Sequence, residues 1–393
     1  MTIHFIYRTV VTGGVETLIL RMGKKFSSEN IQCNVICQEI SGTMESQLKE
    51  VGINIIQLKQ WTFSKAFSFI RKKDIVYTFF LRDFLEMEIL KKMHSHEGRI
   101  FLYVVNSATF FLLRLNKIKF LAKLVKNYFR KIIYFYIDNG NIIFMNEMCI
   151  EYMEDFYKKK VTDPQDKIFR LPIENGIRTV EKRKSDEIHI VSIARADFPY
   201  KGYLLGMVDA FGPLFSKYEN ITLTIISYGE HIDQLKERIR KVDKKYKHRI
   251  HLIGETKYAE LEEYYQQADL YIGLGTTVLE AAKYGVITIN MMMHTNEFQS
   301  GGFFHERYDV LCALKDQYTK GEVVVEKALS FTEEERERYS KLTYDLFMEH
   351  YSIDTIVPKM LERQVKPEDG RVLTLLIAFV RMGRFVKGLI RRK

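Results

Sequence analysis

The sequence predicts an α/β fold with two Rossmann-like domains, each a parallel sheet covered by helices. Short apolar runs alternate with helical patterns almost throughout the 393 residues. The apolar runs are continuous, which is typical of parallel strands that are buried on both faces. A polar, charged stretch at residues 174–186 interrupts this rhythm, which then restarts. At roughly 150 residues per domain, the length also favours two or three cores over one.

The first half of the chain contains six apolar runs that predict strands. Helical spacing of apolar residues follows the first run, at residues 15–27, and the second run, at residues 43–51. This strand-then-helix order is that of parallel β-α-β units. The predicted strands cover residues 3–10, 33–38, 53–58, 75–80, 100–105 and 142–145.

The second half repeats the pattern and predicts five more strands. They cover residues 188–193, 223–226, 250–253, 270–274 and 286–289, with helices predicted at 203–218, 232–244, 258–268 and 278–284. We therefore expect a first domain at residues 1–180, a second at 187–345, and C-terminal helices at 346–393 that end in a basic tail. Ligands of such sheets bind at the carboxyl ends of the strands, so the residues that follow strands matter most.

The net charge of +10 comes from two segments. Residues 112–131 hold seven basic residues and no acid, and residues 371–393 hold seven more, again without an acid. In both, basic residues recur at helical spacing opposite apolar ones, as in helices that lie on anionic membranes, where each basic residue contributes about 1 kcal/mol. Residues 112–131 have a second interpretation, in which the apolar face packs on the sheet and the basic side chains are simply solvated. The predicted membrane contacts are Lys119, Lys123, Lys126, Arg130, Arg381, Arg384, Lys387 and Arg391.

The sequence also favours a cytoplasmic protein on the inner face of the membrane. Met1 is followed directly by a strand-like run, without the features of a secretory signal. No apolar stretch reaches the about 20 residues that a spanning helix needs. Four cysteines without a CxxC pair or a Cys/His cluster predict buried, reduced thiols and no metal site.

The first motif that could carry chemistry is the turn at residues 12–16, Thr-Gly-Gly-Val-Glu, between the first strand and a helix. Gly13 and Gly14 would let the backbone approach a ligand, and a helix N-terminus favours an anion such as phosphate. The run is neither a GxGxxG nor a P-loop, so dinucleotide binding and ATP hydrolysis are not indicated. A tight turn without a ligand explains it equally well.

Two further motifs follow strands of the second half. Arg195 and Lys201 lie on a loop that ends at a glycine before a helix, and together they could clamp a diphosphate. Gly275, Thr276 and Thr277 follow the strand at 270–274 and open a helix. The threonines are expected to cap this helix and to donate to phosphate. Glu280, in the first turns, could accept two sugar hydroxyls. A solvated loop, an ordinary helix cap and a surface glutamate are the alternatives.

Together the motifs resemble those of GT-B glycosyltransferases of the retaining family-4 type, the glycosyl transferases group 1. The resemblance is weak in the first half and close over residues 188–289. It implies two domains facing a central cleft, with the C-terminal helices at 333–363 returning to the first domain. It also implies that Arg195 and Lys201 hold the donor diphosphate, Gly13 and Gly14 close over it, and Glu280 binds the ribose. Residues 254–257 would border the base.

At two positions the chain departs from that family pattern. Ile272 stands where relatives often carry a glutamate that contacts the donor sugar, eight residues before Glu280. Asn106 stands near the position where many relatives carry a histidine, and an amide cannot shuttle a proton. The catalytic residue is therefore unknown, with Asn106 a weak candidate.

The leading hypothesis is a hexosyltransferase that needs no cofactor and uses a UDP- or GDP-linked sugar as co-substrate. No DxD is present, which fits a reaction without metal. Its acceptor would be a saccharide or lipid-linked saccharide of cell-surface polysaccharide or glycolipid assembly. The alternative is a non-catalytic GT-B subunit that acts through a partner. An epimerase would need acid/base groups that the motifs do not offer, and nucleic-acid binding is not expected, because the basic segments are amphipathic.

Overall fold

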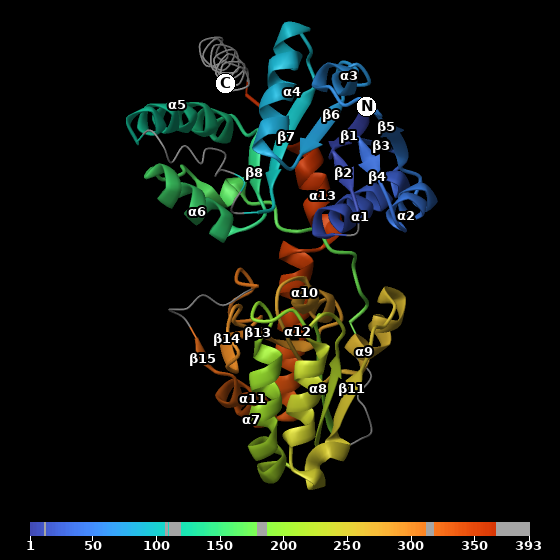
Figure 1. The fold of residues 1–393 in the computed structure, drawn as a ribbon, viewed down its shortest axis with the longest axis vertical. Coiled ribbons are helices and arrows are strands. Elements are labelled where there is room, and N and C mark those ends of the chain that lie inside the picture. The colour runs from blue at the N-terminus through green and yellow to red at the C-terminus, as the bar shows by residue number, and fades with distance from the viewer. Residues whose placement is uncertain (12, 107–108, 110–118, 179–186, 312–317, 367–393) are drawn as a thin grey trace, which may run out of the picture. The chain divides into compact units, whose positions relative to one another are not determined.

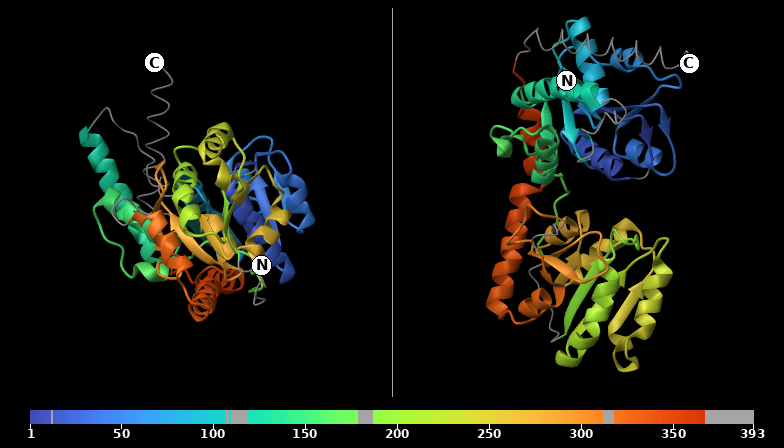
Figure 2. Two further views of the ribbon diagram at one scale, coloured as in Figure 1. Left: turned by 90° about the horizontal axis from the view of Figure 1, so that it is seen from below. Right: turned by 60° about the vertical axis from the view of Figure 1, so that its left-hand side comes forward.

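The computed structural model describes residues 1–11, 13–106, 109, 119–178, 187–311 and 318–366, with the backbone alone at 119–125 and 259. The chain divides into two compact units. Unit 1 comprises Met1–Pro172 and the segment that begins at Ile356, and unit 2 comprises Ile173–Thr355. Each unit is a sheet with helices on its faces (Figures 1 and 2), so the predicted α/β fold class is confirmed.

The sheet of unit 1 is parallel, with strand order β5-β3-β1-β6-β7-β8. If the six strands of this sheet are numbered 1 to 6 along the chain, their order is 3-2-1-4-5-6, as in Rossmann folds. The order across the sheet reverses between β1 and β6. The strands are β1 (Thr2–Ile6), β3 (Gln32–Cys37), β5 (Asn54–Gln57), β6 (Ile75–Thr78), β7 (Arg99–Val104) and β8 (Ile142–Phe144).

Helices cover both faces of this sheet. On one face Phe5 contacts Phe26 and stacks on Tyr77. On the other, Phe84, Ile133 and Met153 belong to one buried cluster. The helices of unit 1 are α1 (Gly14–Ser28), α2 (Met44–Glu50), α3 (Phe63–Phe67), α4 (Leu81–Met93), α5 (Lys119–Asp138) and α6 (Glu147–Tyr157).

The predicted first strand at 3–10 is wrong in extent, because the chain leaves the sheet after Ile6. Backbone N–H groups of Gln38 and Glu39 donate to the Arg8 carbonyl at 2.8 and 3.0 Å, which draws residues 8–10 into a separate ladder. There β2 (Thr9–Val10) pairs in parallel with β4 (Glu39–Ile40). Tyr7 and Arg8 therefore stand just beyond the carboxyl end of β1.

The sheet of unit 2 has strand order β11-β10-β9-β12-β13-β14-β15. Its first five strands are parallel, and their order across the sheet reverses between β9 and β12. Strands β14 and β15 add an antiparallel edge that the sequence did not predict. The strands are β9 (Ile188–Ile193), β10 (Ile221–Ile226), β11 (Ile250–Ile253), β12 (Leu270–Gly273), β13 (Ile287–Met291), β14 (Gln299–Phe303) and β15 (Thr319–Lys320).

The helices of unit 2 are α7 (Tyr203–Lys217), α8 (Ile232–Lys241), α9 (Leu261–Gln267), α10 (Thr276–Ala282), α11 (Gly321–Leu329) and α12 (Glu333–His350). Helix α7 packs closely on the segment that leads into β14. Only glycine fits at position 206 there, since a Cβ would lie 2.5 Å from the Phe298 nitrogen.

The C-terminal helices divide between the units. α12 belongs to unit 2, and α13 (Ile353–Glu362) leads from unit 2 into unit 1. There the Tyr77 hydroxyl donates to the Met360 carbonyl at 3.3 Å, and Arg99 donates to the carbonyls of Leu361 and Arg363 at 2.6 and 2.8 Å. The expected return to the first domain is thus made by α13.

Candidate functional site

In unit 2, the loops that follow β9 and β12 meet at the point where the strand order reverses. These two strands pair directly, with Leu270 opposite Ile190 and Tyr271 opposite Val191. Sheets of this kind bind ligands at the carboxyl ends of the strands at such a point. Both second-half motifs of the sequence lie there, on the β9–α7 loop and at the start of α10.

The β9–α7 loop is held by the neighbouring β10–α8 connection. The Ala196 N–H donates to the Tyr228 carbonyl at 2.7 Å, and the His231 N–H donates to the Ala196 carbonyl at 3.2 Å. The His231 ring returns the contact, because its Nδ1 accepts from the Phe198 N–H at 3.2 Å. His231 thus braces the loop that carries Arg195 and Lys201.

The guanidinium of Arg195 is exposed to solvent, while the aliphatic part of its side chain packs against Gly229. Its side chain is 59% exposed, and Nη2 lies 3.6 Å from Asp197 Oδ2. A Cβ on Gly229 would lie 3.0 Å from Arg195 Cγ, and the φ of 120° at Gly229 also favours glycine. Exposed ion pairs at this distance are weak, so the guanidinium can exchange Asp197 for a phosphate. Lys201 is half-buried at the end of the same loop.

The start of α10 differs from the expectation that threonines cap it. Gly275 is the residue that precedes the helix, with a φ of 71° that favours glycine, and its N–H donates to the Leu311 carbonyl at 2.9 Å. Thr276 and Thr277 are the first two helical residues, so neither is positioned as the cap. Thr276 is exposed, while the Thr277 hydroxyl donates to the Leu274 carbonyl at 3.2 Å.

Glu280 is not a surface glutamate, because only 4% of it is exposed. Its Oε1 accepts from the Tyr258 hydroxyl at 2.8 Å, and its Oε2 lies 2.8 Å from Lys283 Nζ. Lys283 is itself buried, whereas Tyr258 is 56% exposed. The carboxylate is therefore fixed in direction, with a donor at each of its two oxygens. Tyr258 follows residues 254–257 directly and covers one carboxylate oxygen.

In unit 1, the two glycines of the first motif have different environments. A Cβ on Gly13 would lie 2.6 Å from Glu16 Oε2, whereas nothing lies within 4 Å of a Cβ on Gly14. Glu16 is buried at the start of α1, and its Oε1 accepts from the Val11 N–H at 3.3 Å. This acid in the first turn is favourable to the helix dipole. Contact of these glycines with phosphate stays a prediction, and Thr12 lies outside the described residues.

The two positions that depart from the family pattern differ in accessibility. Asn106 is exposed beyond the carboxyl end of β7, and its carbonyl accepts from the Thr109 N–H at 3.1 Å. Ile272 is fully buried in the core of unit 2. A side chain at position 272 therefore points away from any ligand of the sheet edge.

The predicted membrane helix α5 packs its apolar side on the sheet, where Phe129 and Ile132 are buried. Of its basic residues, Lys126 Nζ lies 4.3 Å from the centre of the Phe156 ring, and Arg130 donates to the Tyr157 carbonyl at 3.4 Å. Both thus contact α6. The side chains of Lys119 and Lys123, and all of Arg381, Arg384, Lys387 and Arg391, lie outside the described residues. Within residues 1–366, as far as they are described, none of the helices combines the length and apolar character needed to cross a membrane.

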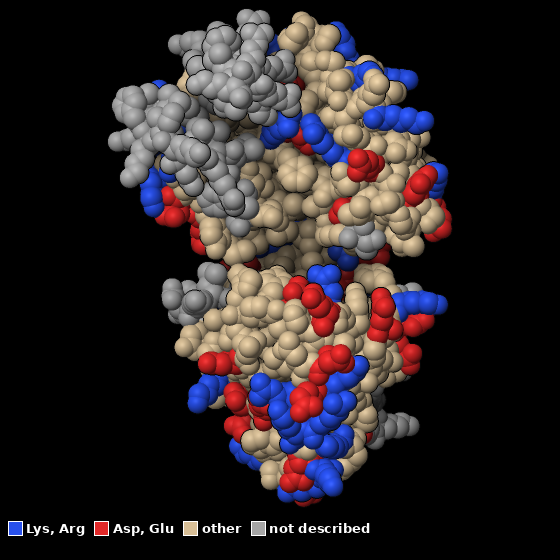
Figure 3. Space-filling model, in the orientation of Figure 1, with Lys and Arg blue, Asp and Glu red and all other residues tan. Residues whose placement is uncertain are grey.

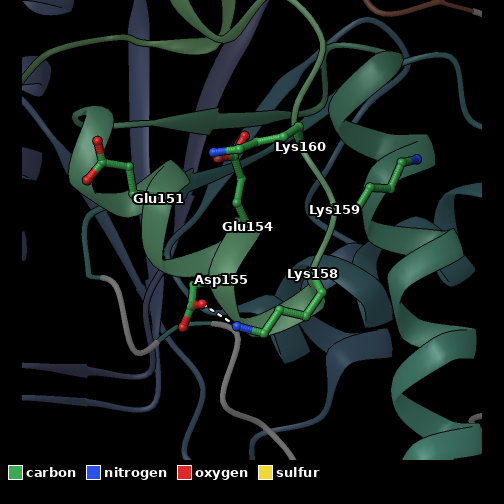
Figure 4. A pocket seen from close by; sticks show the side chains of 6 residues that line it. All are labelled: Glu151, Glu154, Asp155, Lys158, Lys159 and Lys160. Atoms are coloured by element: carbon green, nitrogen blue, oxygen red, sulfur yellow. Dashed lines mark hydrogen bonds and ion pairs between the residues drawn. The ribbon is translucent and has the colours of Figure 1, made fainter.

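A separate pocket of about 390 Å³ lies beside the second half of α6. In Figure 4, Asp155 and Lys158 point toward each other, and they form an ion pair. Lys160 Nζ lies 2.6 Å from Glu154 Oε2, and Lys159 Nζ lies 4.2 Å from the centre of the Tyr134 ring. Since these charges largely compensate one another, the pocket offers no marked preference for a charged ligand.

Sequence reasoning missed four residues that shape the site of unit 2. They are His231 and Gly229, which support the Arg195 loop, and Tyr258 and Lys283, which orient Glu280. Only Lys283 carried a signal, because it stands three residues after Glu280 on a helix. The others come from loops that the strand order brings to the same edge.

Comparison with known proteins bears on the family and on the fold. Residues 174–296, which include both motifs of unit 2, match the family model described as Glycosyl transferases group 1. No curated protein gives a significant match to the chain.

Solved structures share the fold over nearly the whole chain. A glycosyltransferase from Rickettsia africae has a TM-score of 0.64 at 15% identity, covering 92% of this chain and 97% of that one. Anabaena HepE in complex with UDP has a TM-score of 0.64 at 12% identity, covering 92% and 99%. The lipopolysaccharide outer core galactosyltransferase WaaB has a TM-score of 0.55 at 13% identity, covering 92% and 99%. The resemblance to GT-B glycosyltransferases is confirmed: the chain has the fold of these enzymes, and residues 174–296 of its second unit match the glycosyl transferases group 1 model.

Proposed function

We propose that the chain transfers a hexosyl group from a nucleotide-sugar donor, bound by unit 2, to a saccharide acceptor. The observation that carries the proposal is the cation pair Arg195 and Lys201 beside the carboxyl end of β9, within the region that matches the family. Glu280 adds a fixed carboxylate on the neighbouring element, suited to the two ribose hydroxyls. Solved structures of HepE with UDP and with UDP-glucose support a UDP-linked donor, with GDP the second choice.

In this proposal Arg195 and Lys201 stabilise the leaving group. When the bond between the sugar and the diphosphate breaks, the departing nucleoside diphosphate gains negative charge. Arg195 offers a planar fork of N–H donors and Lys201 a point charge, and such fixed charges stabilise the transition state without a metal ion. With Ile272 in the core, the donor sugar must be held by other groups. Retention of configuration is proposed from the family resemblance alone.

The acceptor that we propose is a lipid-linked saccharide at an anionic membrane surface, in cell-surface polysaccharide or glycolipid assembly. The two basic segments support membrane contact, and the fold shared with WaaB supports this kind of pathway. A non-catalytic subunit with the same fold is the alternative, and it differs in its response to nucleotides.

A thermal-shift panel of UDP, GDP, CMP, ADP and their common sugars, with EDTA present, tests the donor site. A nucleotide at a hundred times its dissociation constant should stabilise the protein by about 2.7 kcal/mol. Arg195→Ala should abolish most of that shift, because it removes the phosphate-binding fork. Arg238→Ala is the matched control, since Arg238 is also exposed on unit 2 and paired with an acid, Asp209, at 2.9 Å. Absence of a shift with every nucleotide would favour the non-catalytic subunit.

A further inference from the structure

The β9–α7 loop is the part of unit 2 on which the proposed donor site depends, because it carries both cations. Within the loop, the Asp197 N–H donates to the Arg195 carbonyl at 2.8 Å, and the Lys201 N–H donates to the Asp197 carbonyl at 2.7 Å. The two cations are therefore connected by one short run of backbone turns. Whatever holds the middle of this run, at Phe198, also constrains where the two charges stand.

Neighbouring segments hold the two ends of the run through backbone groups. Near Arg195, both the N–H and the carbonyl of Ala196 bond to the β10–α8 connection. Near Lys201, the His294 N–H donates to the Tyr200 carbonyl at 3.0 Å. Backbone amides neither gain nor lose protons near neutral pH, so these two contacts are insensitive to it.

The middle of the run is held by a side chain. The Phe198 N–H donates to His231 Nδ1 at 3.2 Å, and the centres of the two rings lie 5.7 Å apart with an interplanar angle of 27°. A backbone N–H can only donate, so Nδ1 is the acceptor and the neutral imidazole carries its proton on Nε2. Among these three contacts, only this one has an acceptor that can be protonated.

Protonation of His231 removes that acceptor. An imidazolium has an N–H at both nitrogens, so a second donor would face the Phe198 N–H and the hydrogen bond would be lost. Histidine is the side chain that can change charge between pH 5 and pH 8. The ring position is thus compatible with the bond to Phe198 in one charge state only.

The titratable groups around His231 include both signs of charge and a second histidine. They are Arg195, Asp197, Tyr200 and Lys201 on the loop, Tyr228 and Glu230 on the β10–α8 connection, Asp233 in the first turn of α8, and His294. The His294 ring lies 5.0 Å from that of Tyr200, so it also contacts the loop. A test of His231 must therefore separate its titration from that of His294.

We propose that His231 is a positioning residue whose neutral imidazole keeps the β9–α7 loop in the shape that binds the donor diphosphate. Protonation at Nδ1 releases Phe198, and donor affinity falls as the pH falls. The inference rests on the proposed function, because the ligand of the loop is the nucleotide donor. Acidic pH thus lowers donor binding through the shape of the loop rather than through the two cations themselves.

Two substitutions separate the acceptor of His231 from its ring. His231→Asn places an amide oxygen near the position of Nδ1 and does not titrate, whereas His231→Phe keeps a ring against Phe198 without an acceptor. UDP binding to the full-length protein is measured by isothermal titration calorimetry at pH 5.5, 6.5, 7.5 and 8. UDP is the same in every titration, so its own protonation cancels when two variants are compared at one pH.

The loss of one hydrogen bond in the loop sets the size of the expected effects. Relative to His231→Asn, the wild type should lose about fivefold in UDP affinity between pH 8 and pH 5.5. At pH 8, His231→Phe should bind UDP about fivefold more weakly than the wild type, and His231→Asn should restore most of that loss. His248→Asn, at an exposed histidine of unit 2, is the matched control and should keep the pH dependence of the wild type.

Three results would overturn the inference. The same pH dependence in His231→Asn as in the wild type would place the titrating group elsewhere, for example at His294. A gain in UDP affinity at pH 5.5, relative to His231→Asn, would mean that the imidazolium attracts the phosphates. Equal affinity of His231→Phe and the wild type at pH 8, with intact circular dichroism, would show that the loop does not need the acceptor.

The protonation state of His231 can also be measured without a nucleotide. In protein labelled with nitrogen-15, the imidazole signals that disappear in His231→Asn report which ring nitrogen carries the proton. We expect the Nε2–H form at pH 8, and an Nδ1–H form would overturn the inference. Absence of binding by every nucleotide of the thermal-shift panel, with the Nε2–H form present, would instead defeat the proposed function and leave the contact between His231 and Phe198 standing.

Discussion

At the scale of single residues, Tyr258 controls access to the Glu280 carboxylate. Its hydroxyl already occupies one carboxylate oxygen, while Lys283 holds the other. A ribose that binds Glu280 through two hydroxyls must share or displace the Tyr258 hydrogen bond. The side chain is more than half exposed, so displacement needs no change in the core.

Tyr258→Phe should therefore bind the nucleotide more tightly, by about 3- to 10-fold. The variant removes a hydrogen bond worth about 0.5–1.5 kcal/mol that competes with the ribose. Isothermal titration calorimetry with the nucleotide identified by the thermal-shift panel measures this. Weaker binding would mean that the Tyr258 hydroxyl contacts the nucleotide itself.

Asp83 gives unit 1 a pH-dependent stability. Burial raises the pKa of its carboxyl from 3.8 to about 6, although Arg8 and Arg82 oppose the shift. Below about pH 3 the group is largely protonated in both the folded and the unfolded chain, and its full contribution to stability is present. Between about pH 4 and pH 6 only the unfolded chain ionises, so the free energy of unfolding falls as the pH rises.

Asp83→Asn removes this titration. Relative to the variant, the wild type should lose about 2.4 kcal/mol of unfolding free energy between pH 4 and pH 7. Urea unfolding of both proteins at pH 4, 5, 6 and 7 gives the comparison, with Glu151→Gln as a control on an exposed acid. Parallel stability curves for wild type and Asp83→Asn would contradict the assigned environment of Asp83.

At the scale of elements, Arg249 joins a helix to two strands of unit 2. It is the last residue of a 3₁₀ helix (Lys244–Arg249), directly precedes β11, and is buried. Its Nη1 and Nε donate to the carbonyls of Phe215 and Ile221 at 2.9 Å each, and Nη2 donates to the Tyr218 carbonyl. One guanidinium thus satisfies carbonyls at the end of α7 and the start of β10.

Arg249→Lys should lower the unfolding free energy of unit 2 by about 3 kcal/mol. Lysine keeps the charge but lacks the fork, so buried carbonyls lose their donors, at about 1–3 kcal/mol each. Arg240→Lys on exposed α8 is the control and should change stability by less than about 0.5 kcal/mol. Chemical denaturation followed by circular dichroism measures both, and equal effects would argue against the role of the fork.

How well the sequence predicts the structure differs from one strand to another. Strands β9 and β11 coincide with the predicted runs, because a buried parallel strand needs uninterrupted apolar residues, which sequence alone displays. The β2–β4 pair and the antiparallel β14 and β15 were missed, since short edge strands depend on hydrogen bonds to distant partners.

Among the candidate site residues, too, those that stand close together in the sequence could be predicted, whereas those far apart could not. Arg195 stays a predicted donor-binding residue, and the sequence could propose it because its motif is contiguous. The proximity of Arg8 to Trp61 and Asp83 was not predicted. These residues stand far apart in the sequence, on two loops and in the first turn of α4, and only the strand order brings them together. For Glu280 the structure rules out the alternative of a surface glutamate, and nothing in the sequence shows that Tyr258 covers one of its oxygens.

At the scale of the whole molecule, the charge is unevenly distributed. The basic tail has no acid, whereas Lys/Arg and Asp/Glu are interspersed on the part of unit 2 that Figure 3 shows. Ion pairs of unit 2 include Arg238–Asp209 and Lys217–Glu326. Attraction to an anionic bilayer should therefore depend on the basic segments.

Replacing the four basic tail residues by glutamine should weaken binding to phosphatidylglycerol-containing vesicles at least tenfold, at about 1 kcal/mol for each charge. Neutral vesicles should bind little, and 0.5 M salt should reduce binding. Cosedimentation measures these affinities. The replaced residues are Arg381, Arg384, Lys387 and Arg391; the matched control replaces Lys236, Arg240, Lys241 and Lys244, which are exposed on unit 2 and change the net charge equally. Equal loss in both variants would show that net charge, rather than the tail, causes binding.

The path of α13 has a consequence for how the protein is made. Unit 1 is completed only by the segment that begins at Ile356, which carries Met360 and Leu361 to Tyr77 and Arg99. Ribosomes add about 5–20 residues per second, so synthesis of unit 2 separates the two parts of unit 1 by roughly 10–40 s. During that interval the nascent first sheet stands without α13 on one face, exposing apolar side chains that a chaperone would recognise. Unit 2, continuous in sequence, can fold first.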